Sequence, residues 1–282
     1  MAGHAAEVKV TILVDNLVRR RKLRGEHGLS LLVETEGKRL LFDTGQSGEI
    51  LVHNSTEIGL NLNDVDCVVL SHGHYDHTGG LPLLLNRLGH MNLYAHPEAF
   101  GKKYAKTEKG EVREVGSPLT NEELLALGAM LHLNEKPTWL SDNMVLSGEI
   151  AQTTDFEALP SEFMARRDDE LVTDFLPDDL SIGIKTSKGL IVILGCSHVG
   201  VINTIKHIQE LTETEAVHAV IGGMHLEKAD MNRIRLTIQA FTKLGVKKVI
   251  PLHCTGFRAC AEMACLLGER FMLGSVGVSL EF

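Results

Sequence analysis

The segment LSHGHYDHTGG, residues 70–80, places three histidines and an aspartate within six consecutive positions. His72 and His74 are two residues apart, so their side chains point to the same side of an extended segment. Asp76 and His77 follow after a turn and can face the same point. Because imidazole nitrogens and carboxylate oxygens are common ligands of Zn²⁺, the segment predicts a metal site.

The number of donors in this segment predicts two ions rather than one. A single catalytic ion keeps a position open for water or substrate and does not need four donors from one turn. We expect His72 and His74 to bind one ion, and Asp76 and His77 to bind a second. The alternative is a histidine-rich surface loop. The apolar residues VDCVVL, 65–70, argue against it, because they predict a buried strand that ends at the segment.

The composition limits the classes of function. The 282 residues are 44% hydrophobic, which is enough for a sizeable core, and the net charge is −9. An acidic chain lacks the basic surface that general binding to nucleic acid or anionic membranes requires, so neither is expected as a partner. The basic run RRRKLR, residues 19–24, is interpreted as a solvated loop.

The cysteines and the N-terminus concern the compartment. The five cysteines are dispersed and odd in number, which does not predict a disulfide framework. The N-terminal stretch MAGHAAEVKV has no basic region followed by an apolar one, so no signal peptide is expected. No apolar stretch reaches the roughly 20 residues of a membrane span. We therefore expect a cytoplasmic protein.

Strand and helix patterns divide the chain into three blocks. Residues 8–95 predict short strands, a hairpin over 29–45 and a helix over 78–89. Residues 176–282 predict a hairpin over 180–196, followed by helices and strands that alternate. The block between them carries more charge and few long apolar runs. We interpret it as an inserted loop-rich region at about 96–175, which is either a lid or substrate wall or a decorative or oligomer-forming excursion.

The first and third blocks repeat at a constant offset. The hairpin that begins at Leu29 overlays the one that begins at Leu180, since 180 − 29 = 151. With the same offset VDCVVLSHGH overlays AVHAVIGGMH, and His74 falls on His225. This predicts two sheet halves that meet at one seam, each bringing a histidine. A chance similarity between β hairpins is the alternative, because the identities are few.

The motifs SHGHYDHTGG and LLFDTG resemble the HxHxDH motif of the metallo-β-lactamase superfamily and the motif that precedes it. The resemblance implies an α/β fold, a four-layer αββα sandwich with two pseudo-repeated halves and the site at one edge of the facing sheets. It implies one domain over residues 1–282 that contains the inserted region. Asp43 would orient a metal-bound histidine from outside the ligand shell.

The resemblance also implies metal ligands from the C-terminal half. His253, in LHCTG, follows a strand as the last histidine of the superfamily does, and we expect it on the ion of Asp76 and His77. His198, in GCSHVG, follows another strand, and we expect it on the ion of His72 and His74.

One position departs from the superfamily pattern. Where GD usually supplies a bridging aspartate, this chain has Gly195-Cys196. Either Cys196 takes the bridging place while His198 coordinates, or His198 is only a neighbour. His225 is a further candidate, as a ligand or as a residue that handles a proton.

Other residues complete the candidate site. Asp76 and His225 are the candidates for moving a proton, and His27, in EHGLS, can reach the mouth of the site. Cys254 adjoins His253, but no Cys–His–Asx arrangement is evident, so catalysis by a thiol is not favoured.

A metal pair lowers the pKa of water from 15.7 toward about 7, which predicts a metal-dependent hydrolase acting on an ester or phosphoester. Together the motifs look similar to a superfamily branch with an archaeal dihydropterin–ribofuranosylaminobenzene-phosphate synthase. This implies the alternative of a pterin-type transferase that releases diphosphate. A non-catalytic metal or ligand sensor is the third hypothesis.

We expect two divalent ions, zinc first, with iron, manganese or magnesium as alternatives. The expected partner is a small molecule that the resemblance makes phosphate-bearing, and a homodimer is compatible with the acidic chain.

Overall fold

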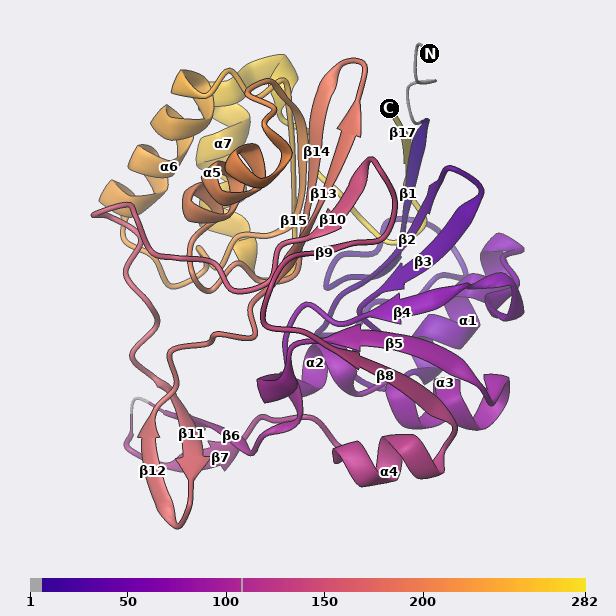
Figure 1. Ribbon diagram of the computed structural model, residues 1–282. Coiled ribbons are helices and arrows are strands. Elements are labelled where there is room, and N and C mark those ends of the chain that lie inside the picture. The colour runs from indigo at the N-terminus through magenta and orange to yellow at the C-terminus, as the bar shows by residue number, and fades with distance from the viewer. Residues whose placement is uncertain (1–6, 108) are drawn as a thin grey trace.

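Two sheets face each other and carry helices on their outer faces in the computed structural model, which describes residues 7–107 and 109–282 (Figure 1). The first sheet has the strand order β17-β1-β2-β3-β4-β5-β8 and the second has the order β16-β15-β14-β13-β10-β9. Helices α1 and α3 cover the first sheet, and α5, α6 and α7 cover the second. The predicted αββα sandwich is confirmed.

The elements have the following bounds. The strands of the first sheet are β1 Val8–Val14, β2 Ser30–Thr35, β3 Lys38–Phe42, β4 Cys67–Val69, β5 Met91–Ala95, β8 Ala129–Leu133 and β17 Ser279–Glu281. Those of the second are β9 Thr138–Trp139, β10 Met144–Leu146, β13 Ser181–Thr186, β14 Gly189–Leu194, β15 Val217–Gly223 and β16 Lys248–Leu252. The helices are α1 Glu49–Ile58, α2 Tyr75–Thr78, α3 Leu81–Leu88, α4 Asn121–Ala126, α5 Val201–Thr212, α6 Met231–Lys243 and α7 Phe257–Leu267.

Alternation along the strands places apolar side chains in separate cores. In β14, Ile191 and Ile193 pack between the two sheets, whereas Val192 and Leu194 pack against the helices. A strand that is buried on both faces needs a continuous apolar run, which is why residues 189–194 read GLIVIL. The central strands are therefore held rigidly, and their ends give fixed positions for functional side chains.

The two sheets repeat one topology. Strand β2 begins at Ser30 and β13 at Ser181, and 181 − 30 = 151, so the predicted offset is confirmed. In both halves an antiparallel hairpin is followed by a helix, a parallel strand, a second helix and another parallel strand. Strand ends of both halves meet at the same edge of the sandwich.

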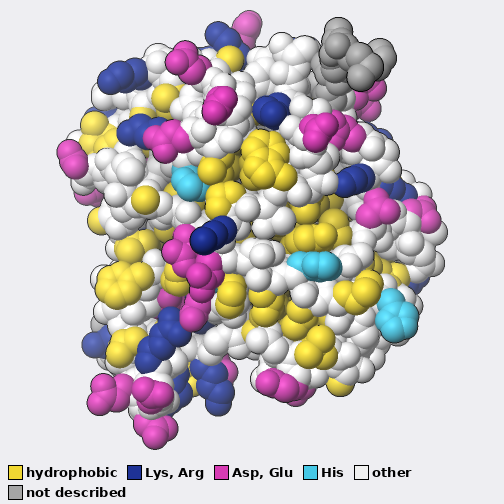
Figure 2. Space-filling model, in the orientation of Figure 1, with side chains coloured by type: hydrophobic (Ala, Val, Ile, Leu, Met, Phe, Trp, Pro, Cys, Tyr) yellow, Lys and Arg dark blue, Asp and Glu magenta, His cyan; other side chains and the backbone are white. Residues whose placement is uncertain are grey.

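The block 96–175 contains more structure than a loop-rich insertion. Strands β8, β9 and β10 belong to the two sheets of the sandwich. The remainder forms a third sheet of β6 Lys103–Lys106, β7 Val112–Glu114, β11 Phe163–Arg167 and β12 Glu170–Thr173. This third sheet projects from the sandwich in Figure 1, and charged side chains of both signs cover it at the lower left of Figure 2.

The helix predicted over residues 78–89 begins three residues later than expected and is preceded by a separate helical turn. Residues Tyr75–Thr78 form α2, and α3 begins at Leu81 after two glycines. A Cβ atom on Gly79 would lie 1.9 Å from the carbonyl oxygen of Gln46, and one on Gly80 would lie 2.2 Å from that of Thr44. Only glycine allows this close backbone approach, which presses α2 against the loop after β3.

The helices of the described chain are too short or too polar to cross a bilayer. Residues 1–6, part of the stretch in which no signal peptide was predicted, lie outside the described residues.

Candidate metal centre

The predicted donors converge at the edge of the sandwich where parallel strands end. His72 and His74 follow β4, and Asp76 and His77 lie on the single turn of α2. In the C-terminal half, each of three strands is followed by one histidine: His198 follows β14, His225 follows β15 and His253 follows β16. Residues more than a hundred positions apart therefore meet at one point.

The first group of donors is formed by His72, His74 and His198, the triad that we call the first triad. His72 Nε2 lies 3.0 Å from His74 Nδ1 and 3.2 Å from His198 Nε2. All three side chains are buried, and the three ligand atoms lie within 4.8 Å of one another. The structure thus brings His198 to the pair with which the sequence placed it.

Asp76, His77 and His253 form the second triad. His253 Nε2 lies 3.2 Å from Asp76 Oδ2 and 3.3 Å from His77 Nε2, and Asp76 Oδ2 lies 3.8 Å from His77 Nε2. His27 lies at the open side of this triad, with Nε2 3.2 Å from Asp76 Oδ2, and its side chain is 51% exposed. It therefore stands at the mouth of the site, as the sequence predicted.

Hydrogen bonds on the outer side of the rings turn lone pairs inward. His77 Nδ1 lies 2.7 Å from Asp43 Oδ2, and His253 Nδ1 lies 2.8 Å from Asn16 Oδ1. These acceptors place the proton of each neutral ring on Nδ1, so each ring in its neutral form carries a lone pair on Nε2. Two lone pairs that face each other at 3.3 Å repel unless a proton or a cation lies between them. The donor set therefore fits a divalent metal ion.

Asp43 is the centre of this outer support. Its Oδ1 accepts from the backbone N–H of Ser71, and its Oδ2 accepts from Ser71 Oγ as well as from His77, each at 2.7 Å. Ser71 Oγ lies in turn 2.9 Å from His72 Nδ1. One buried carboxylate thus orients one histidine of each triad.

The electrostatics of the two triads differ. Burial would lower the pKa of His77, but the carboxylates of Asp43 and Asp76 raise it to about 9. Burial lowers the pKa of His74 to about 3 and keeps that ring neutral with a free lone pair. The second triad therefore attracts positive charge through its carboxylates, whereas the first offers neutral nitrogen donors.

Cys196 lies between the triads. Its Sγ is 3.2 Å from His77 Nε2 of the second triad and within 4.8 Å of the ligand atom of His72 in the first. Of the three residues that the sequence left open for the bridging role, Cys196 is therefore the one that contacts a histidine of each triad. His225 lies outside both triads, with its ring centroid 4.3 Å from that of His198.

Two aspartates that the sequence analysis missed hold the backbone of the first triad. Asp178 Oδ2 accepts from the N–H of Gly73, which stands between His72 and His74, and Asp179 Oδ2 accepts from the N–H of Val199, next to His198. Both contacts measure 2.8 Å. The available signal was a pair of adjacent acidic residues that leads directly into a buried strand.

The first of these aspartates is part of a buried ion network. Lys103 Nζ lies 2.9 Å from Asp178 Oδ1 and 2.8 Å from Asp174 Oδ2, and all three side chains are at most 3% exposed. Because Lys103 belongs to β6, this network connects the third sheet to the backbone of the first triad.

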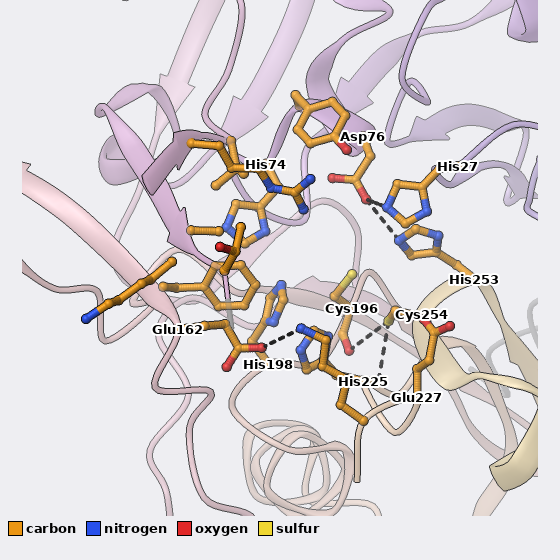
Figure 3. A pocket seen from close by; sticks show the side chains of 18 of the residues that line it. His27, His74, Asp76, Glu162, Cys196, His198, His225, Glu227, His253 and Cys254 are labelled. Carbon is orange, nitrogen blue, oxygen red and sulfur yellow. Dashed lines mark hydrogen bonds and ion pairs between the residues drawn. The ribbon is translucent and has the colours of Figure 1, made fainter. Parts of the chain in front are cut away.

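A cavity of about 550 Å³ opens above the donors (Figure 3). Its floor includes His74, Asp76, Cys196, His198 and His253. The third sheet forms one wall and contributes Phe163, whose ring centroid lies 4.6 Å from that of His74 and 5.1 Å from that of His198. The sequence did not predict the structure of this wall. Its Phe163 ring covers His74 and His198 of the first triad on the cavity side.

Comparison with known proteins agrees with this geometry. The model of the metallo-beta-lactamase superfamily matches residues 23–206. The chain is 36% identical to the 7,8-dihydropterin-6-methyl-4-(beta-D-ribofuranosyl)-aminobenzene-5'-phosphate synthase of Methanocaldococcus jannaschii, over 83% of this chain and 82% of that protein. It is 34% identical to an uncharacterised protein of the same organism, over 95% and 98% of the two chains. Among solved structures, Tm1679, a metal-dependent hydrolase of the beta-lactamase superfamily, matches with a TM-score of 0.83 and 30% identity, over 98% and 99% of the two chains.

Proposed function

Because this chain belongs to the metallo-β-lactamase superfamily, we propose that it is a metal-dependent hydrolase that cleaves an ester or phosphoester of a small anionic molecule. The observation that carries the proposal is the pair of adjacent triads, of which His74, His198, Asp76 and His253 line the floor of the cavity. Each triad would hold one divalent ion, zinc first, with iron, manganese or magnesium as alternatives.

When bound, such an ion pair makes water acidic enough to act as a nucleophile near neutral pH and polarises the oxygen that is attacked. The chain supports this chemistry in three ways. Asp43 holds a ring of each triad in place, and the Cys196 sulfur can join the two ligand shells. His27 and His225 line the cavity outside the triads, where either ring can hold a proton for a leaving group. Asp76 contacts both His253 and His27, so it fits the role of a ligand better than that of a free base.

The proposed substrate follows from the wall of the cavity. Lys106, Lys109 and Arg113 line it from the β6–β7 hairpin. Lys228 lies opposite, but its Nζ is 3.3 Å from Glu162 Oε1 and is therefore partly neutralised. Cations on the hairpin would attract a phosphate or carboxylate group, while Phe163 offers an apolar surface beside the triads.

A pterin-type transferase is the second candidate. It is favoured by the 36% identity to the archaeal synthase over most of both chains. In such a reaction the two triads and the basic hairpin would hold a diphosphate that leaves while two organic groups are joined. The two triads and the basic hairpin would serve both reactions, so an assay of the products distinguishes hydrolysis from transfer.

The test combines metal content with turnover. Protein freed of metal with a chelator is reloaded separately with zinc, iron, manganese or magnesium, and is assayed with bis(p-nitrophenyl) phosphate, a phosphomonoester and a lactone. We expect one metal equivalent per triad and hydrolysis that requires the metal. His74→Ala should abolish hydrolysis, and His90→Ala, at an exposed position, should not.

Two results would overturn the hydrolase. Diphosphate release from a dihydropterin diphosphate and an aromatic amine, without hydrolysis of any ester, would identify the transferase. Fully loaded protein that turns over none of these substrates would instead identify a protein that senses a metal or ligand.

A further inference from the structure

A third group of donors lies beside the two triads. Cys196, His225 and Cys254 offer ligand atoms that all lie within 4.8 Å of one another. They stand at the ends of three adjacent parallel strands, β14, β15 and β16, and gather in the lower half of Figure 3. The sequence did not favour Cys254 as a nucleophile, and Cys254 belongs to neither triad.

The backbone around this group is held in place. Cys254 Sγ accepts from the backbone N–H of His225 at 3.3 Å and lies 3.6 Å from the carbonyl oxygen of Cys196. A Cβ atom on Gly223 would lie 2.4 Å from the Gly195 carbonyl oxygen and 2.7 Å from Cys254 Sγ, so glycine is required there. The three strand ends are therefore packed so closely that the donors are oriented before any ligand arrives.

Local strain and an unpartnered atom point to a function for this arrangement. His225 has a φ of 45°, a left-handed conformation that is costly for a residue with a side chain and persists where surrounding structure imposes it. Its Nδ1 is buried and has no hydrogen-bond partner among the described residues. A buried nitrogen without a partner is unfavourable, and a bound cation would satisfy it.

The chemistry of the donors differs from that of the triads. The triads offer imidazole and carboxylate, whereas this group offers two sulfurs and one imidazole. Sulfur ligands select soft or borderline ions such as Zn²⁺ or Cd²⁺ and are poor ligands for Mg²⁺. Three protein donors leave a fourth position open, and all three residues line the cavity. The N–H of His225 that reaches Cys254 Sγ would also stabilise the sulfur as a thiolate.

We propose that Cys196, His225 and Cys254 form a third, sulfur-rich cation subsite that takes a soft or borderline divalent ion and shares Cys196 with the neighbouring triads. Binding releases the two thiol protons to solvent, so the ion is held by two thiolates and one neutral imidazole. The subsite does not depend on which reaction the protein catalyses. It predicts that thiophilic metals bind in a larger number than magnesium does.

The test is a metal titration of the whole, reduced protein with Cd²⁺ and with Co²⁺. Wild-type protein should bind one more equivalent of Cd²⁺ than the Cys254→Ser variant, and its sulfur-to-cobalt charge-transfer absorbance should fall in that variant. Serine can still donate and accept a hydrogen bond, so the variant keeps the local contacts while losing the soft ligand. His225→Gln should lose the same equivalent, and the control Cys265→Ser, at an exposed thiol, should bind as the wild type does.

Two results would overturn the subsite. The first is a Cys254→Ser variant that folds as the wild type does by circular dichroism, binds Cd²⁺ with unchanged stoichiometry and shows unchanged cobalt charge-transfer absorbance. The second is wild-type protein that does not bind the extra equivalent of Cd²⁺ and in which mass spectrometry shows a disulfide between Cys196 and Cys254. Both results concern metal stoichiometry and leave open whether the protein hydrolyses an ester, which the turnover assay above measures separately.

Discussion

The two halves of the sandwich have the same strand topology but carry their donors in different ways. In the N-terminal half four donors stand within residues 72–77, and Asp43 of the same half orients two of them, His77 directly and His72 through Ser71. In the C-terminal half each of three strand ends brings a single histidine. The position equivalent to Asp43 is Leu194, since 43 + 151 = 194, and His198 Nδ1 has no partner among the described residues. The two halves therefore share a backbone topology but not a donor arrangement. The N-terminal half carries a cluster of donors oriented by Asp43, and the C-terminal half adds single histidines to that cluster.

The segment 174–179 belongs to neither half and joins them. Asp178 binds the backbone beside the N-terminal histidines, and Asp179 binds the backbone beside His198. Lys103 neutralises the first of these carboxylates together with Asp174. Substitutions in this segment therefore test how much the two halves depend on the contacts that join them.

The largest effect is expected from Lys103→Met. The change leaves two buried carboxylates without their cation, which costs about 3–5 kcal/mol of the free energy of unfolding. Chemical denaturation measures this loss, and Lys102→Met, at the exposed neighbouring position, should change stability by less than about 0.5 kcal/mol. Equal stability of the two variants would contradict the network.

The same variant has a characteristic pH dependence. Burial raises the pKa of Asp178, but the Lys103 ammonium outweighs it, so the pKa lies below the ordinary 3.8. In the wild type this carboxylate stabilises the fold above pH 3.8, and the contribution is lost as pH falls through the lower folded pKa. In Lys103→Met the lowering effect of the ammonium is lost, burial is opposed mainly by the Gly73 N–H, and we expect the pKa of Asp178 to rise. The stability deficit of the variant should therefore shrink as the pH is lowered from 7 toward about 4. A deficit that stays constant over this range in denaturation experiments would contradict the prediction.

His72→Ala tests the N-terminal cluster directly. Structural zinc sites with four ligands bind with about 10–16 kcal/mol, so one ligand accounts for roughly 3 kcal/mol, or about 100-fold in affinity. Competition with a chelating dye should show this loss for the ion of the first triad. If His72→Ala bound metal as tightly as His90→Ala does, the first triad would not be a metal site.

Asp43→Asn should have a smaller effect, because it removes a partner of the ligands rather than a ligand. Loss of such a partner typically lowers metal affinity or activity by about 10–100-fold. Leu194→Val, at the equivalent position of the C-terminal half, should change metal affinity little, because it alters only packing. Equal effects from the two variants, measured by the same competition, would show that the halves support the metal in the same way.

The smallest effect is expected from Lys228→Met at the mouth of the cavity. Its side chain is 77% exposed and its partner Glu162 is 27% exposed, so the ion pair is screened by water. Such pairs contribute about 0–1 kcal/mol. Unfolding free energy should change by no more than this, and a larger loss would mean that the pair holds the third sheet against the sandwich.

Local patterns in the sequence predicted the parts of the fold that depend on neighbouring residues. The helices and strands predicted to alternate after the second hairpin are present as α5, β15, α6, β16 and α7, and the two hairpins lie at the predicted offset of 151. Hydrophobic periodicity decides such elements because their hydrogen bonds are made within the element or across one turn. The helix over 78–89 was placed wrongly at its start, since the close contact of Gly79 with the Gln46 backbone comes from a distant loop.

The crowding of donors in residues 72–77 by itself determined that a metal centre was to be expected, because spacing along one turn decides which side chains can share an ion. Only the tertiary structure decided that His198 joins the first triad and His253 the second, and that Cys196 lies between them. It also decided the roles of Asp178, Asp179 and Lys103, which carry no motif. These contacts depend on how two sheets and a projecting third sheet pack together, and burial over such sequence distances leaves no periodic signal along the chain.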